Sequence, residues 1–304
     1  MTRDIAASVR QRLLNLAREQ GRPFQEMLQF FVMERFLYRL SQSKHADRFV
    51  LKGALMLLVW EAPQSRPTRD IDMLGHTENS PEALLEQVAE VMQVDAGDDG
   101  LMFHLESLQA ERITADAEYD GVRVLGWASL AGARARLQID VGFGDAVLPA
   151  PERSRYPVLL DLPQPEVLCY SRESAIAEKF QAIVALGDLN SRMKDFYDIW
   201  LLTRQFDFDM EILAAAISAT FQRRETAFPD RPFFTTRFSR DKQGQWRAFS
   251  ARLGDGVPVE PDFGNVLAVL EEFLGLVVDY LMGNSNGIAL WTRERWLTPD
   301  KNDE

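Results

Sequence analysis

Residues 66–74 read Arg66-Pro67-Thr68-Arg69-Asp70-Ile71-Asp72-Met73-Leu74, an Asp-x-Asp pair that leads into a short apolar run. Successive side chains of a β-strand point to opposite faces, so Asp70 and Asp72 would share one face of a strand. Two carboxylates this close repel each other in a partly buried site unless a cation or a shared proton lies between them. Oxygen ligands at this spacing suit Mg²⁺, which favours a metal-bound phosphate as substrate. The alternative is a pair of solvated residues at the start of a strand.

The chain before this pair has the pattern of a strand, a glycine and a helix. Phe49-Val50-Leu51-Lys52 is a short apolar strand, and an apolar helix pattern follows Gly53 up to residue 60. Glycine allows close approach of a ligand to the backbone, and a strand-to-helix junction presents free N–H groups to an anion. Gly53 and Ala54 are therefore candidate phosphate-binding residues.

This order of motifs resembles the DNA polymerase β-like nucleotidyltransferase superfamily. The runs Phe49 to Ala54 and Thr68 to Gly75 look like those of its AbiEii/AbiGii toxin family. Members of that family often have Gly-Gly or Gly-Ser where this chain has Gly53-Ala54, so phosphate contact here would be left to the backbone. The resemblance also makes Lys52 and Arg69, within the two motifs, candidate substrate-binding residues.

A mainly β section is predicted between residues 101 and 143, where apolar and polar residues alternate. In its last strand, Asp140 lies on the face opposite Ile139 and Val141. A single Asp in a strand is usually structural or exposed. The resemblance nevertheless implies that Asp140 is the third carboxylate of the superfamily's metal site, on a strand next to the Asp-x-Asp strand.

A second informative region follows residue 171, where two helices are expected. The first contains Ala177-Glu178-Lys179, and the second contains Arg192-x-Lys194-Asp195-x-x-Asp198. Taken alone, the second helix reads as an amphipathic helix with exposed charge pairs. The two motifs together match the same toxin family, which implies that Lys179 and Asp198 are catalytic. By the same resemblance Arg192, Lys194 and Asp195 are candidate substrate-binding residues.

The segment 221–253 interleaves arginines with aromatic residues, and two interpretations remain open. Arginine beside aromatic rings is what a groove for RNA needs, because it offers phosphate charge and stacking faces. The same composition is found in an ordinary bundle of surface helices.

Composition limits the class of protein. The chain has 304 residues, 46% of them hydrophobic, a net charge of −12 and a single cysteine, Cys169. This acidity disfavours diffuse attachment to nucleic acid or anionic membranes, so any RNA contact should use a local basic patch. No signal peptide or long apolar run is found, which predicts a cytoplasmic protein without a membrane partner. Three scattered histidines make a zinc site improbable.

Two domains are expected. Helices over about 5–20 and 24–41 should pack on the sheet that carries the Asp-x-Asp, and the proline-rich stretch 146–165 is interpreted as a linker. The predicted fold class is α+β, with a polymerase β-like nucleotidyltransferase domain over 1–160 and a mixed sheet within it. A mainly helical domain over 166–304 would contribute Lys and Asp residues to the cleft.

The resemblance implies a Mg²⁺-dependent nucleotidyltransferase toxin of a toxin–antitoxin system, with a cognate antitoxin protein as partner. Asp70, Asp72 and Asp140 would hold the metals, and Lys179 would neutralise the triphosphate of an NTP. The acceptor would be an RNA such as the tRNA 3′ end, and its modification would block translation. Transfer to a protein hydroxyl and a non-catalytic NTP-binding module are the alternatives. Retention of all three carboxylates and of Lys179 argues against the second of these.

Overall fold

The computed structural model describes residues 4–62, 68–113, 121–253, 257–285, 289–293 and 295–297. Arg66 and Pro67, at the start of the Asp-x-Asp stretch, lie outside these residues. The chain divides into two compact units. The first comprises the described residues within Met1–Glu61, Pro67–Gly144 and Glu152–Cys169, and the second comprises those within Ala62–Arg66, Asp145–Pro151 and Tyr170–Glu304.

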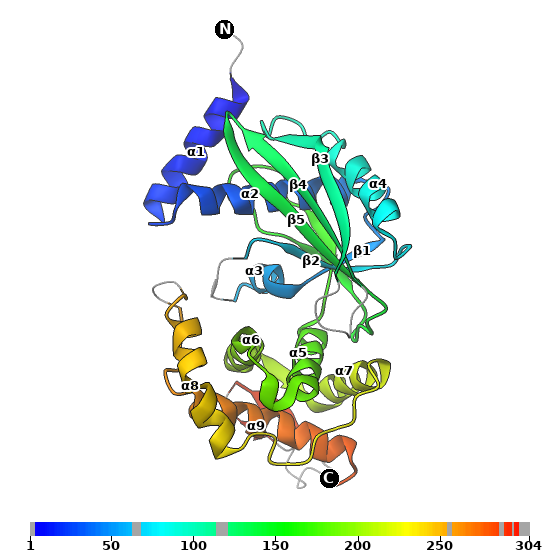
Figure 1. Cartoon of the computed structure of the whole chain (residues 1–304), viewed down its shortest axis with the longest axis vertical. Helices are drawn as coiled ribbons and strands as arrows, with labels where there is room; N and C mark the ends of the chain where they lie inside the picture. Colours follow the sequence, from blue (N-terminus) through cyan, green and yellow to red (C-terminus); the bar gives the residue numbers. More distant parts are fainter. Residues whose placement is uncertain are drawn as a thin grey trace, which may run out of the picture. The chain divides into compact units, whose positions relative to one another are not determined.

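The first unit is built on a mixed sheet (Figure 1). Among the described residues this sheet has seven strands in the order β3-β4-β5-β2-β1-β7-β6. Strand β2 runs parallel to β5 and β1 runs parallel to β7, whereas the other neighbours are antiparallel. The strands are β1 Phe49–Lys52, β2 Ile71–Gly75, β3 Met102–Ile113, β4 Gly121–Leu130, β5 Ala133–Phe143, β6 Glu152–Arg155 and β7 Glu166–Cys169. The mixed sheet predicted from the sequence is confirmed.

Three helices of this unit pack against the sheet: α1 Ile5–Glu19, α2 Phe24–Gln42 and α4 Pro81–Met92. Helix α2 contacts β5 and β7, α4 contacts β3 and β4, and α1 packs on α2 and β4. Helix α4 begins after Ser80, whose Oγ accepts a hydrogen bond from the Ala83 N–H at 3.1 Å. In β5 a buried set that includes Ile139 alternates with less buried residues that include Asp140. In β2 Asp72 is half-buried and the other residues are buried.

The proposed linker over 146–165 is wrong for part of its length. Glu152–Arg155 forms β6, which pairs antiparallel with β7. The prolines exclude long regular structure, but they flank this four-residue edge strand instead of interrupting it. Charged side chains of α2 hold the following loop: the Leu159 N–H donates to Glu34 at 2.7 Å, and Arg35 donates to the Pro163 carbonyl at 2.7 Å.

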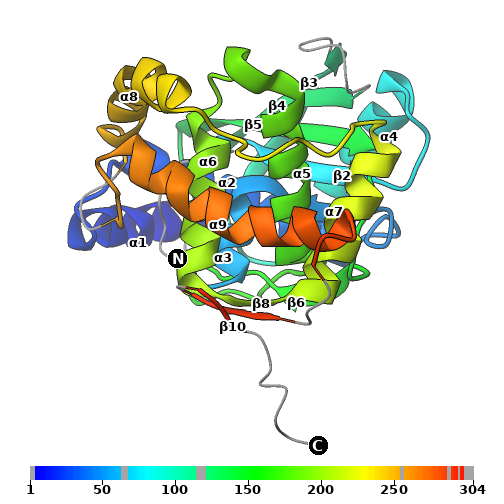
Figure 2. The same ribbon diagram turned by 90° about the horizontal axis from the view of Figure 1, so that it is seen from below.

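The second unit is mainly helical, as predicted (Figure 2). Helix α9 packs on α6, α7 and α8, and α5 packs on α6 and α7. A small sheet in the order β10-β9-β8, which the sequence did not indicate, completes the unit. The elements are α5 Arg172–Leu186, α6 Met193–Gln205, β8 Asp207–Asp209, α7 Met210–Arg223, α8 Thr236–Ser250, α9 Phe263–Leu281, β9 Leu290–Thr292 and β10 Trp296–Leu297. No helix in the described part of the chain combines the length and the apolar character that crossing a bilayer requires.

Aromatic rings of the segment 221–253 form much of the core of this unit. Phe221, Phe238 and Trp246 are buried, and Phe221 packs on Phe180 while Phe238 and Trp246 pack on Phe263. The arginines are partly used in ion pairs, as in the contact of Arg231 with Glu271 and Asp279. The interpretation as a helical bundle therefore accounts for these buried rings, which are not faces available to bases.

Candidate functional site

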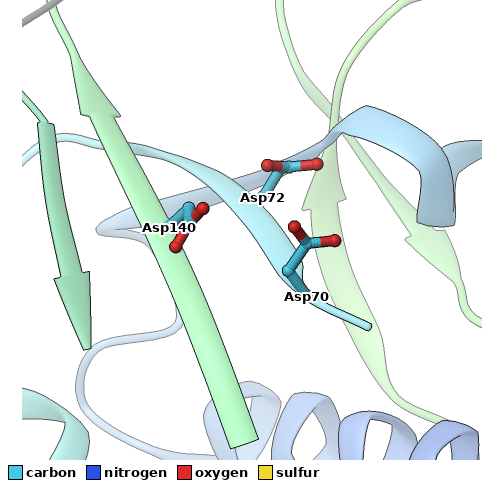
Figure 3. Close-up of side chains that lie close together, drawn as sticks. All are labelled: Asp70, Asp72 and Asp140. Atoms are coloured by element: carbon cyan, nitrogen blue, oxygen red, sulfur yellow. The ribbon is translucent and has the colours of Figure 1, made fainter. Parts of the chain in front are cut away.

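Three carboxylates converge on the sheet of the first unit. Strand β2 lies parallel to β5 with Asp72 directly opposite Asp140, and Asp70 immediately precedes β2. Figure 3 shows the side chains of Asp70, Asp72 and Asp140 directed toward one another. One carboxylate oxygen from each lies within 4.8 Å of those from the other two, and all three residues are half-buried. The pairing of β2 with β5 therefore joins residues that are far apart in the sequence.

Gly53 lies directly against the Asp72 carboxylate. Strand β1 runs antiparallel to β2 with Lys52 opposite Asp72, and the chain then turns at Gly53 with φ of 72°. A Cβ atom added to Gly53 would lie 2.0 Å from Asp72 Oδ2. Glycine is thus required both by the positive φ and by the position of the Asp72 carboxylate. Ala54 follows in the 3₁₀ turn Gly53–Leu55, and the predicted helix is the short α3, Met56–Val59.

Hydrogen bonds orient the carboxylates of Asp70 and Asp140. Thr68 Oγ1 donates to Asp70 Oδ1 at 2.6 Å, and Gln138 Nε2 lies 3.3 Å from both oxygens of Asp140. Arg123 of β4 forms a fork on Asp140, with Nε 2.8 Å from Oδ1 and Nη2 2.7 Å from Oδ2. These hydrogen bonds raise the pKa of the Arg123 guanidinium, and the Asp70 charge adds to the effect.

Sequence reasoning did not identify Thr68, Arg123 or Gln138 as part of the site. The strand alternation does place Gln138 on the face of Asp140. Arg123 lies opposite Asp140 only through the β4–β5 register, which no short pattern reveals. Arg69, which was predicted to bind substrate, is exposed, and its carbonyl accepts a hydrogen bond from Gln29 at 3.3 Å.

A second charged cluster lies within the second unit, between α5 and α6. Lys179 Nζ is 2.7 Å from Asp198 Oδ2 and 3.4 Å from Asp195 Oδ1. Arg192 Nε is 2.7 Å from the other oxygen of Asp195. Asp195 and Asp198 are 0% and 1% exposed, so the alternative of exposed charge pairs is wrong for these two acids. Lys194 is exposed.

The chemistry of the first cluster is that of a hard cation site. All three potential ligands are carboxylate oxygens, which Mg²⁺ and Ca²⁺ prefer over nitrogen or sulfur. Their mutual repulsion would be relieved by a divalent ion bound between them. The residues present therefore fit the metal that the sequence motifs imply.

Comparisons with known proteins place the chain in a family. The family model described as "Nucleotidyl transferase AbiEii toxin, Type IV TA system" matches residues 35–269. No curated protein matches the chain. Among solved structures, a candidate nucleotidyltransferase from Helicobacter pylori aligns with a TM-score of 0.49 and 14% identity over 86% of this chain and 98% of its own. JHP933 from the same organism aligns with a TM-score of 0.47 and 13% identity over the same shares.

Proposed function

Because the chain belongs to the AbiEii nucleotidyl transferase toxin family of type IV toxin–antitoxin systems, we propose that it transfers nucleotides from an NTP to an RNA in a Mg²⁺-dependent reaction. The family makes it a nucleotidyltransferase and implies a nucleotide substrate and an antitoxin partner. The proposed acceptor is tRNA, modified at its 3′ end in the cytoplasm so that translation is blocked. The observation that carries the proposal is the convergence of Asp70, Asp72 and Asp140 on neighbouring strands.

We assign the metal site to these three carboxylates. Asp70 and Asp72 would hold the ions beside the NTP, and Asp140 would complete the site next to the acceptor hydroxyl. Bound divalent ions supply neutralisation of the triphosphate charge and make the acceptor hydroxyl easier to deprotonate. Asp140 would assist that deprotonation as a proton acceptor. Thr68 and Gln138 would keep Asp70 and Asp140 in orientation through the hydrogen bonds already described.

The remaining predicted residues would act on the nucleotide. At the turn beside Asp72, the backbone N–H groups of Gly53 and Ala54 would bind phosphate oxygens, assisted by the charge of Lys52. Lys179 would neutralise the triphosphate as a point charge. Arg192, Lys194 and Arg69 would add positive charge for substrate binding, and Asp195 and Asp198 would fix the Lys179 ammonium through their ion pairs.

Transfer to a protein hydroxyl is a second candidate, and one observation keeps it open. The aromatic rings of 221–253 were the sequence feature that favoured RNA, and Phe221, Phe238 and Trp246 among them are buried in the core. RNA recognition would then have to rest on charged and backbone groups. A non-catalytic NTP-binding module is disfavoured, because the carboxylates and Lys179 are all retained and are engaged in ordered clusters.

The acceptor can be identified directly. The purified chain is incubated with Mg²⁺ and each of four α-labelled NTPs in turn, with total tRNA or with total cell protein as acceptor. We expect label on tRNA from a preferred NTP, and complete loss of label when EDTA removes the metal. Label on protein alone would replace the RNA acceptor, and equal labelling with and without EDTA would contradict the metal assignment.

A further inference from the structure

Arg123 engages the carboxylate that the metal site would need. Its guanidinium contacts both oxygens of Asp140, at 2.8 and 2.7 Å, in the bidentate geometry that gives the strongest carboxylate pairing. The contact is partly shielded from solvent, since the Asp140 side chain is 15% exposed and that of Arg123 is 34% exposed. The pair therefore fixes the orientation of the Asp140 carboxylate.

A guanidinium and a divalent cation make opposing demands on this carboxylate. Both bind the oxygens of the same carboxylate, and an Arg is always charged, so it repels a cation nearby. Asp70 accepts a hydrogen bond from neutral Thr68, whereas Asp140 pairs with the Arg123 cation. Asp70 and Asp140 are therefore not equivalent toward an incoming ion.

We propose that Arg123 is a built-in counter-ion that competes with the divalent cation for Asp140. In the metal-free protein it neutralises part of the carboxylate repulsion and keeps Asp140 out of the ligand set. Asp140 joins the ligand set when Arg123 is displaced. This inference rests on the proposed function, because it assumes that the three carboxylates hold a metal.

An alternative role for Arg123 predicts the opposite change in metal affinity when Arg123 is removed. If Arg123 served to orient Asp140 as a metal ligand, as outer hydrogen-bond partners of metal ligands commonly do, its removal would weaken metal binding. If it competes with the metal, its removal strengthens metal binding. Metal affinity without nucleotide or acceptor therefore distinguishes the two roles independently of activity.

The experiment is calorimetric titration of Mn²⁺ into five full-length proteins: wild type, Arg123→Gln, Arg123→Lys, Arg136→Gln and Asp72→Asn. Arg136 lies on β5 four residues before Asp140, roughly 13 Å along the strand, so its removal makes the same charge change away from the carboxylates. We expect Arg123→Gln to bind Mn²⁺ roughly three- to tenfold more tightly than wild type, and Arg136→Gln to match wild type. Arg123→Lys should fall between, because a single ammonium cannot form the fork.

Thermal melting accompanies each titration. Without metal, Arg123→Gln should melt at a lower temperature than wild type, because Asp140 has lost its counter-ion. Mn²⁺ should raise the melting temperature of Arg123→Gln by more than it raises that of wild type. Unchanged or weaker Mn²⁺ affinity in Arg123→Gln would overturn the inference while leaving the metal site intact. If Arg123→Gln does not fold, Arg123→Lys replaces it in the comparison. Mn²⁺ affinity in Arg123→Lys that is no tighter than in wild type would then overturn the inference. If Asp72→Asn binds Mn²⁺ as wild type does, the metal assignment itself fails and the inference falls with it.

Discussion

Gly53 illustrates how a single residue links the fold to the site. Its φ of 72° places it where an L side chain is strained, and its missing Cβ leaves the space that the Asp72 carboxylate occupies. Gly132, in the turn between β4 and β5, has a similar φ of 81° but no atom within 4 Å of an added Cβ. Substituting each glycine in turn therefore distinguishes the effect of backbone strain from the effect of displacing the Asp72 carboxylate.

We predict that Gly53→Ala and Gly132→Ala each lose about 1–2 kcal/mol of stability from the positive φ. Only Gly53→Ala should also lose nucleotide transfer, because the added methyl group displaces Asp72. Urea unfolding and transfer assays on both variants test this. Full transfer by Gly53→Ala would show that the position of the Asp72 carboxylate is not critical.

Lys179 offers a second test at the scale of the residue. Because Asp195 and Asp198 are buried around it, Lys179→Met should cost about 3–5 kcal/mol of stability, the usual penalty for an uncompensated buried charge. The double variant Lys179→Met/Asp198→Asn removes one charge of each sign and should recover much of that stability. NTP affinity, measured with labelled nucleotide, should stay low in both variants. Recovery of NTP binding together with stability would make Lys179 a purely structural residue.

The site could be predicted from sequence only as far as local patterns reach. Asp70 and Asp72 follow from strand alternation, and Asp140 could be selected among the strand residues because of the family resemblance. Arg123 could not be predicted as part of the site, since its contact with Asp140 depends on how β4 and β5 are aligned. The burial of Asp195 and Asp198 also depends on tertiary packing around α6, which the charge pattern of that helix does not reveal.

At the scale of the element, α2 carries charges into the core. Glu34 is 1% exposed, contacts Arg35 with its Oε1 at 3.0 Å and accepts the Leu159 N–H at 2.7 Å with Oε2. Burial raises the pKa of Glu34 to about 7, although the Arg35 charge opposes the shift. The folded protein therefore holds a proton on Glu34 at pH values where the unfolded chain has lost it.

The sign of the pH dependence follows from this raised pKa. Protonation of Glu34 favours the folded state fully below pH 4.5, and this contribution is lost as the pH rises through about 7. Glu34→Gln keeps an acceptor for Leu159 but does not titrate. We predict that wild type loses on the order of 1–3 kcal/mol relative to Glu34→Gln between pH 4.5 and 8. Urea unfolding of both proteins across that range measures the difference, and a constant difference would contradict the raised pKa.

The strands after β5 show where element prediction fails. The prolines correctly indicated that the stretch 146–165 lacks long regular structure. The interpretation as a linker failed because β6 needs only the four residues 152–155, which lie between prolines. Strand β7 pairs in parallel with β1, which lies more than a hundred residues earlier, and no local pattern encodes that pairing. The hydrogen bonds from α2 to the intervening loop are equally non-local.

At the scale of the whole molecule, the change in hydrophobic period correctly predicted a sheet-based part followed by a helical part. The path of the chain between them was not predictable. Residues 145–151 belong to the second unit, where the Leu148 N–H donates to Ser174 Oγ at 2.8 Å, before β6 and β7 return to the first. This excursion depends on side-chain contacts with α5 and leaves no signal in the composition.

The central claim is that Asp70, Asp72 and Asp140 form the metal site of a nucleotidyltransferase. Its most direct test is the Mg²⁺-dependent transfer of labelled nucleotide by Asp72→Asn, beside wild type and the exposed, charge-matched control Asp188→Asn. We predict that Asp72→Asn remains folded in circular dichroism but loses transfer by roughly 100-fold or more, while Asp188→Asn keeps wild-type activity. Wild-type transfer by folded Asp72→Asn would contradict the assignment of the site.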